Sequence, residues 1–173
     1  NEKSMTMPTP NIENRAFWEY SVSRYTKGDM APLALLLQDN HKVNVNVLLL
    51  ICWCLENNVI INLPQLKAVI AASSATEEKL QYHRARRKAA SPEKGGDQAE
   101  YDALKAQELE LERQQQHDIV ASFNEQPVTH LGQGQSVSSN VFNASIAAFI
   151  NAYGLRDNNE ARQLVSLVVN HLS

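Results

Sequence analysis

The longest apolar run in the chain lies near its centre and predicts a buried helix. Almost every position from 47 to 55 is apolar, and asparagines stand on both sides, at Asn44 and Asn57. A helix that is apolar on all its faces is one surrounded by protein. A buried parallel strand would give a similar run, but the chain has no second such run and no glycine turn with which to build a sheet. We therefore expect a central helix over residues 45–57, with a core that includes Leu48, Ile51 and Leu55.

Two shorter amphipathic segments precede the central helix. Asn14 is placed to cap a first helix, which Gly28 ends as a C′ residue. Asp29 can cap a second helix. The spacing of apolar residues predicts one buried face on each of them. These faces are Trp18, Val22 and Tyr25 in the first helix, and Leu33, Leu36 and Leu37 in the second.

A long pair of helices follows. Asn62 can cap a fourth helix that continues to about residue 90, with a break or bend expected at residues 73–74. The segment 91–96, Ser-Pro-Glu-Lys-Gly-Gly, is the clearest loop in the chain. A fifth helix is expected over residues 97–123. Because the loop between them is short, the two helices should be antiparallel neighbours.

The C-terminal part predicts a long loop and two further helices. Residues 124–138 are polar and irregular, which favours the least ordered internal segment. The sixth helix should run from about Ser139 to Gly154, and Asp157 with Glu160 resembles the capping box of a seventh. The expected buried stripe of the last helix is Ala161, Leu164, Val165, Val168 and Leu172.

These patterns predict an all-α fold, a single compact bundle of about seven helices around the central helix. With 173 residues, the chain is long enough for one well-packed domain but too short for two. We expect a flexible N-terminal tail at 1–13 and one helical domain over 14–173, with loops at 91–96 and 124–138. The natural start of the protein is expected at Met5 or Met7.

Charge is distributed unevenly along the chain. The net charge of −3 excludes a uniformly basic nucleic-acid coat. Residues 1–95 carry a net charge of +3 and residues 96–173 a net charge of −6, so the basic end of the fourth helix directly precedes the acidic fifth helix. We expect these two segments to neutralise each other.

The basic end of the fourth helix is the strongest candidate for chemistry. Its residues could bind phosphate, RNA or an acidic partner, but no aromatic platform is interleaved with them and the chain lacks a wider positive face. The favoured interpretation is a network of structural ion pairs with the fifth helix. The cluster consists of His83, Arg84, Arg86, Arg87 and Lys88.

A hairpin turn centred near residue 94 sets the expected pairs of this network. Lys88 or Arg87 should meet Glu100, and Arg84 should reach Glu108, with Glu112 also in the network. Glu108 and Glu112 could alternatively supply two carboxylates of a helical metal site. No histidine completes a Glu-x-x-His motif, so we expect no metal.

The remaining chemistry-bearing residues are expected to be structural. Cys52 and Cys54, the only cysteines, should be buried small apolar residues, and the lack of a disulfide framework fits a reducing compartment. Trp18 and Trp53 should lie in the core, and Asn46 should cap the backbone locally. The chain shows no nucleotide-binding, hydrolase or metalloprotease motif, and we expect no cofactor.

Several segments are similar to a bacterial family of uncharacterised all-helical proteins, the domain of unknown function 2390 family. The resemblance covers most of residues 14–154 and implies a compact cytoplasmic helical protein without an assigned activity, so it transfers no catalytic residue. The segments that carry it are Phe17-Trp18-x-Tyr20-Ser21-Val22, Leu35-x-Leu37-Gln38-Asp39, Val43-x-Val45-Asn46, Arg84-x-x-Arg87-Lys88 and Glu108-Leu109-x-x-Glu112.

These observations favour a non-enzymatic cytoplasmic interaction or accessory protein whose partner is another protein. One alternative is binding of a phosphate-bearing ligand or RNA through residues 83–88. Another is an enzyme or lipid-binding helical fold with an interior cavity. A membrane span is not expected, because the longest apolar stretch is nine residues and a bilayer needs about 20.

Overall fold

The central apolar run forms α3 (Val45–Glu56), as its pattern predicts. The structure is a computed structural model that describes residues 11–131 and 139–172, without the side chains of residues 139–143. Nine of the twelve residues of α3 are buried, and they include Leu48, Ile51 and Leu55. The Asn44 side chain caps the helix by accepting hydrogen bonds from the backbone N–H groups of Asn46 and Val47, which satisfies donors that the first turn leaves unpaired.

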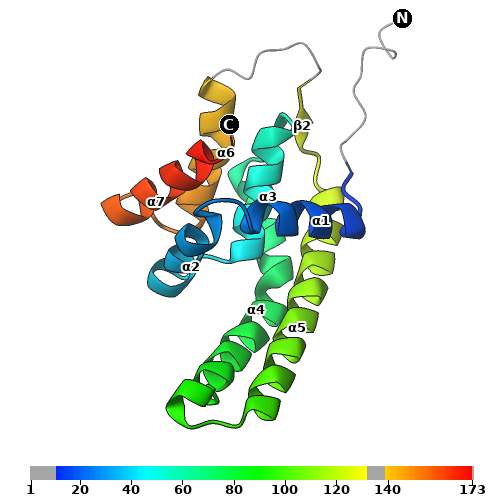
Figure 1. Cartoon of the computed structure of the whole chain (residues 1–173). Coiled ribbons are helices and arrows are strands. Elements are labelled where there is room, and N and C mark those ends of the chain that lie inside the picture. Colours follow the sequence, from blue (N-terminus) through cyan, green and yellow to red (C-terminus); the bar gives the residue numbers. More distant parts are fainter. Residues whose placement is uncertain (1–10, 132–138, 173) are drawn as a thin grey trace, which may run out of the picture.

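The described residues form an all-α fold of seven α-helices with one short 3₁₀ helix and one two-stranded ribbon (Figure 1). The other elements are α1 (Asn14–Tyr25), α2 (Met30–His41), β1 (Val59–Ile60), α4 (Leu63–Ala89), η2 (Pro92–Lys94), α5 (Gln98–Glu125), β2 (Thr129–His130), α6 (Ser139–Ala152) and α7 (Asn159–Asn170). α3 contacts α1, α2, α5 and α6, so the central helix is covered on several sides. None of the helices in the described part of the chain is long and apolar enough to cross a membrane.

α4 and α5 form an antiparallel hairpin that projects away from the other helices (Figure 1). The break expected near residues 73–74 is absent, because α4 is one continuous helix. The Ser73 hydroxyl donates to the Ile70 carbonyl at 2.7 Å, and the Ser74 hydroxyl donates to the Ala71 carbonyl at 2.8 Å. Both hydroxyls bond to carbonyls of their own helix, and α4 continues through both residues.

The buried faces of α1 and α2 differ in part from the expected ones. Val22 is 48% exposed and Leu36 is 44% exposed, whereas Trp18 is half-buried. α1 instead buries Phe17 and Ser21, which are spaced i, i+4. Several apolar residues in this segment allow more than one helical face, and contact with α3 and α5 selects the face of Phe17.

Two segments expected to be loose contain fixed structure. β2 pairs antiparallel with β1 within the predicted loop 124–138, and α5 extends through Glu125. In the predicted tail 1–13, Ile12 is buried and its backbone N–H and C=O are both bonded by the Asn124 side chain, at 2.9 and 3.0 Å. Residues 132–138 and 1–10 lie outside the described residues.

The last helix packs as its stripe predicts, but its cap is different. Ala161, Leu164, Val165 and Val168 of α7 are buried. The capping side chain is Asn158, whose Oδ1 accepts a hydrogen bond from the Ala161 N–H at 3.0 Å. Asp157 is one residue too early for this bond, so the predicted Asp157–Glu160 capping box is wrong.

Candidate functional site

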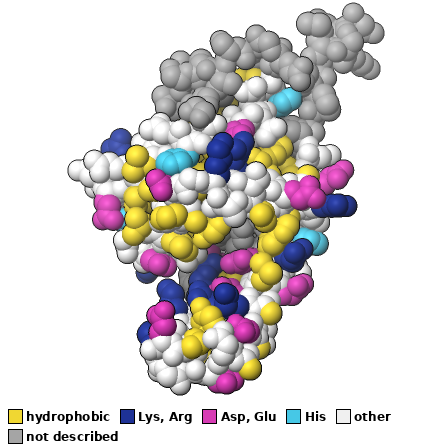
Figure 2. Space-filling view, in the orientation of Figure 1, with side chains coloured by type: hydrophobic (Ala, Val, Ile, Leu, Met, Phe, Trp, Pro, Cys, Tyr) yellow, Lys and Arg dark blue, Asp and Glu magenta, His cyan; other side chains and the backbone are white. Residues whose placement is uncertain are grey.

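The basic cluster of residues 83–88 lies on α4, and three of its members face carboxylates. Arg84 Nη1 is 3.0 Å from Glu77 Oε1, Arg87 Nε is 3.1 Å from Glu108 Oε1, and Lys88 Nζ is 3.9 Å from Asp39 Oδ1. On the face shown in Figure 2, basic and acidic side chains lie next to one another on the hairpin. A phosphate group would have to displace these carboxylates.

The partners within this network differ from the expected ones. Arg84 pairs with Glu77, two turns earlier on its own helix, and this leaves Glu108 to Arg87. Glu100 is exposed and forms no ion pair with a described residue. The error arises because the prediction considered only partners across the hairpin, whereas residues seven apart also share a helix face.

The other two members of the cluster contact an aromatic ring that the sequence reading missed. Tyr82 is 64% exposed, and the Arg86 guanidinium carbon lies 5.7 Å from the centroid of its ring. The His83 ring is perpendicular to the Tyr82 ring, with centroids 6.0 Å apart. Arg86 therefore stays at the surface, and Tyr82 stands directly before the cluster in the sequence.

Glu112, also expected in this network, lies near these ion pairs but forms none with a described residue. Burial and the neighbouring charge of Glu108 raise its pKa to about 7, although Arg84 and Arg87 act in the opposite direction. A carboxyl group with such a pKa gains or loses its proton near neutral pH. Among the described residues, no group of three His, Cys, Asp or Glu side chains could hold a metal ion.

A network of buried amide side chains joins α3 to α5 and α1. Asn46 Nδ2 donates to Gln115 Oε1 at 2.8 Å, and Gln116 Nε2 donates to Asn46 Oδ1 at 3.0 Å and to Ser21 Oγ at 2.9 Å. Asn46 is therefore a long-range partner, and its expected role as a local backbone cap belongs to Asn44. The sequence signal for this network is that Gln115 falls on the same face of the fifth helix as the apolar residues Leu111 and Ile119.

The cysteines lie inside the core and Trp53 packs against it, whereas Trp18, which was predicted to be a core residue, is half-buried outside the core cluster. Cys52 and Cys54 are free and buried, and burial raises the pKa of the Cys52 thiol to about 12, so it stays protonated at neutral pH. Trp53 packs edge-on against Phe123 at 5.7 Å between centroids. Trp18 is covered by the Arg113 guanidinium, 4.3 Å from the ring centroid.

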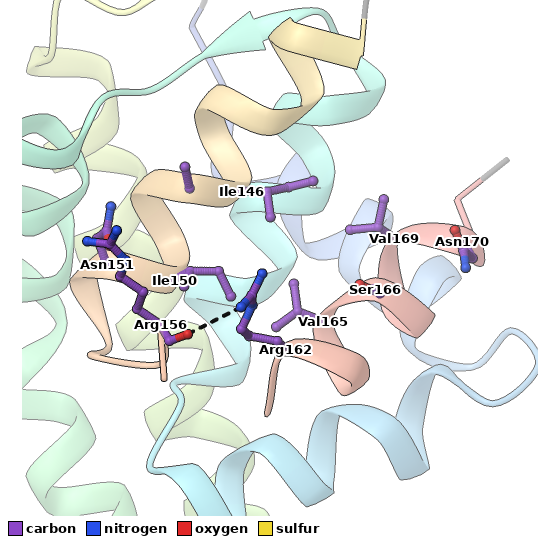
Figure 3. A pocket seen from close by; sticks show the side chains of 10 residues that line it. Ile146, Ile150, Asn151, Arg156, Arg162, Val165, Ser166, Val169 and Asn170 are labelled. Carbon is purple, nitrogen blue, oxygen red and sulfur yellow. Dashed lines mark hydrogen bonds between the residues drawn. The ribbon is translucent and has the colours of Figure 1, made fainter. Parts of the chain in front are cut away.

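A groove between α6 and α7, of about 830 Å³, is the larger of two hollows described for this structure (Figure 3). Two rows of β-branched side chains form its floor, each with i, i+4 spacing. Ser166, Asn151 and Ala147 add small or polar surface, with Asn170 at the far end. The two rows are Ile146 and Ile150 of α6, and Val165 and Val169 of α7.

Arg156 and Arg162 give this groove a positive end. Arg162 Nη1 donates to the backbone carbonyl of Arg156 at 3.4 Å. In Figure 3 the Arg162 side chain lies between Ile150 and Val165, and the Arg156 side chain extends toward Asn151. The ten residues that line the groove include no carboxylate. This site was not predicted from the sequence, although Arg156 and Arg162 are two of only four basic residues in the acidic segment 96–173.

A smaller hollow of about 410 Å³ lies between α2 and α4. It is lined by Lys42, Arg84 and Lys88 together with Asp39 and Glu77. Arg84 and Lys88 already face those two carboxylates, so most of the charge in this hollow is compensated within the protein.

Comparison with known proteins gives one family match. The model of a family described as Protein of unknown function (DUF2390) matches residues 16–119, more than half of the chain. The match includes most of α1, all of α2 to α4 and most of α5, and it ends before α6 and α7, short of the expected limit at residue 154. No curated protein and no solved structure matches the chain.

Proposed function

The chain belongs to the DUF2390 family of proteins of unknown function, and we propose that it is a non-enzymatic docking protein that binds a segment of another protein in the groove between α6 and α7. The observation that supports the proposal is the groove itself, where the partly buried Ile146, Ile150 and Val169 lie among polar side chains and next to two arginines. The proposal includes one cooperative helical domain and a cytoplasmic location, which two free cysteines favour.

The floor of the groove is suited to burial by a partner. Ile146, Ile150 and Val169 are only partly buried, although all three pack against the hydrophobic core. Removing apolar surface from water stabilises a complex by roughly 25 cal/mol per Å² before the costs of association are subtracted. A partner that covers these side chains would therefore gain from burial, and the rigid helices beneath would need little rearrangement.

The charged groups support docking over catalysis. The ionisable side chains that line the groove are Arg156 and Arg162. Arginine remains protonated in proteins, so these groups can bind an anion but cannot exchange protons as a general acid or base does. Glu112, whose pKa is raised to about 7, lies instead in the ion-pair cluster of α4 and α5.

The pairing of the basic cluster also supports docking over RNA binding. Arg84 and Arg87 are held by Glu77 and Glu108, and their side chains are 14% and 22% exposed. Nucleic-acid binding relies on basic side chains that are available to phosphates. These two arginines stabilise the hairpin, which leaves Arg86 as the exposed arginine of the cluster.

Site-specific photo-crosslinking in the native cell tests the docking proposal. A photo-reactive residue at Ser166 should give one discrete adduct, and the same residue at Ser74, which is exposed on α4, should not. Ala147→Trp should abolish the adduct, because Ala147 lines the groove and the indole would fill it. The matched control is Ala144→Trp, an exposed position of α6 outside the groove lining.

Two results would contradict the proposal. The first is no adduct from Ser166, or the same adducts from Ser166 and Ser74. The second is an adduct that survives Ala147→Trp as well as it survives Ala144→Trp. Circular dichroism of both tryptophan variants establishes that they fold.

A further inference from the structure

We infer that the segment bound between α6 and α7 is an acidic amphipathic helix with a carboxylate within one turn of its apolar anchors. This inference rests on the docking function proposed above and names the chemistry of the partner. It is carried by the juxtaposition of Arg156 and Arg162 with the two apolar rows of the groove.

The positive end of the groove differs from every other arginine site in the described residues. Arg15, Arg24, Arg84 and Arg87 form ion pairs with carboxylates, and Arg86 and Arg113 lie over aromatic rings. Arg156 and Arg162 have neither kind of partner within the described part of the chain. Arg162 is nevertheless oriented by its bond to the Arg156 carbonyl, so a guanidinium is held beside the apolar floor.

The shape of the floor favours a helix as the occupant. Its two rows have i, i+4 spacing, and the lining of α7 runs from Arg162 to Asn170, which is about 12 Å or two helical turns. A docked helix presents apolar side chains at i, i+3 and i+4 along one face. An extended peptide would leave its backbone groups unpaired, because the walls are helices whose own backbone bonds are internal.

The openness of the groove favours a helix over a fatty acid, which shares its apolar and anionic character. Small-molecule sites usually enclose about 70–90% of the ligand surface. The lining of this groove comes from α6, α7 and the turn between them, so one side stays open. A bound acyl chain would leave apolar surface in water there, whereas an amphipathic helix would turn its polar face outward.

The position of the arginines also sets the direction of the helix. Arg156 and Arg162 lie at one end of the groove, and Asn170 lies at the other (Figure 3). The C-terminal end of a helix carries partial negative charge. The C-terminal turn of the partner and its acidic side chains should therefore lie over the two arginines.

Binding of designed peptides to the full chain tests this inference. The probe is a fluorescent helical peptide with leucines at i, i+4 and i+7 and glutamates in its last turn, and the matched peptide carries lysines in place of the glutamates. Fluorescence anisotropy should show that the acidic peptide binds at least about tenfold more tightly than the basic one. Increasing salt should reduce this difference.

Charge reversal in the protein should reverse the preference. The double variant Arg156→Glu, Arg162→Glu should weaken the acidic peptide at least about tenfold and should bind the basic peptide more tightly than the unmodified chain does. Arg86→Glu is the control, because it reverses an exposed arginine far from the groove. The single variant Arg156→Gln removes one exposed charge and should give a smaller loss in the same direction.

Specific results would overturn the inference. Equal affinity for the two peptides would do so, as would unchanged binding by the charge-reversed variants or displacement of the acidic peptide by oleate at equal concentration. If neither peptide binds while Ser166 crosslinks a protein in a manner that Ala147→Trp abolishes, the acidic class is wrong and the docking function stands. If the crosslink is also absent, both are wrong.

Discussion

At the scale of single residues, the interior of this protein is polar where its main helices meet. Asn46, Gln115 and Gln116 are buried, and each amide bonds to another across α3 and α5. A buried amide without a partner is costly, whereas a bonded one restricts neighbouring helices to one relative position. These side chains therefore fix the register of α3 against α5, because apolar contacts alone would allow more than one register.

Removing Asn46 should have a much larger effect than removing an exposed asparagine. Asn46→Ala removes the donor to Gln115 Oε1 and one of the acceptors of Gln116 Nε2 in a buried site. We therefore expect a loss of about 1–3 kcal/mol in the free energy of unfolding. Asn40→Ala on the exposed side of α2 should change it by less than about 0.5 kcal/mol. Urea denaturation of both variants measures the difference, and equal midpoints would contradict a structural role for the network.

Glu112 should make the stability of the protein fall as pH rises toward neutrality. Its pKa is about 7 in the folded protein against an ordinary value of 4.5, so between these values the folded state holds a proton that unfolding releases. Stability therefore decreases as pH rises from about 4.5 to about 7 and loses nothing further from this group above that range. The total is about 3 kcal/mol for a shift of this size.

Glu112→Gln should remove this pH dependence. The amide cannot ionise, so the variant should be more stable than the unmodified chain at pH 8 and similar to it at pH 5. Urea denaturation across this range measures the difference between the two proteins, which cancels most other titrating groups. A difference that does not change with pH would show that Glu112 has an ordinary pKa.

At the scale of elements, the hairpin of α4 and α5 owes its charge pattern to internal pairing. Its half facing away from the core buries few apolar residues, among them Leu80 and Leu104. Partly buried ion pairs therefore contribute more to the stability of the hairpin than they would on an ordinary exposed surface, where each is worth about 0.2–1 kcal/mol.

The paired and unpaired arginines of the basic cluster should respond differently to neutralisation. Arg87→Gln leaves Glu108 beside the largely buried Glu112 without its counter-charge, and we expect a loss of about 1–3 kcal/mol in the free energy of unfolding. Arg86→Gln, at the neighbouring position of α4 and exposed, should cost less than about 0.5 kcal/mol. Thermal unfolding of both variants compares them directly, and the reverse order would refute the assigned pairs.

The elements that the sequence predicted well are those with local signals. The Asn62 cap is a full capping box with Gln65, Asp97 caps α5, and the apolar run of α3 left no ambiguity about its burial. Features set by tertiary contact were predicted poorly. The buried face of α1, the Glu77 partner of Arg84 and the docking of Ile12 depend on which neighbour packs there, and periodicity along the chain carries little of that information.

The candidate site shows the same division. The basic cluster was visible in the sequence because its residues are adjacent, but its neutralisation by Glu77 and Asp39 was only partly foreseen. The groove of α6 and α7 was missed because Arg156 and Ile146 are ten residues apart and no motif links them. Its residues meet only when the turn after α6 brings α7 alongside.

At the scale of the whole molecule, the core, the hairpin and the groove occupy different places. The hairpin projects from one end, and α6 and α7 cover another side of the central helices (Figure 1). The family match includes the core and the hairpin but not the two helices that form the groove. The proposed docking function therefore rests on the geometry of α6 and α7 in this chain and not on membership of the family.

Chemical-shift mapping of the full chain with the acidic helical peptide tests the docking claim most directly. Titration should shift the backbone amide signals of residues 146–151 and 156–170, which include the groove lining, and leave those of residues 82–88 at the basic cluster unchanged. Saturable shifts confined to the two groove segments are the result that the account predicts. Shifts centred on residues 82–88, or no saturable shifts in α6 and α7, would contradict it.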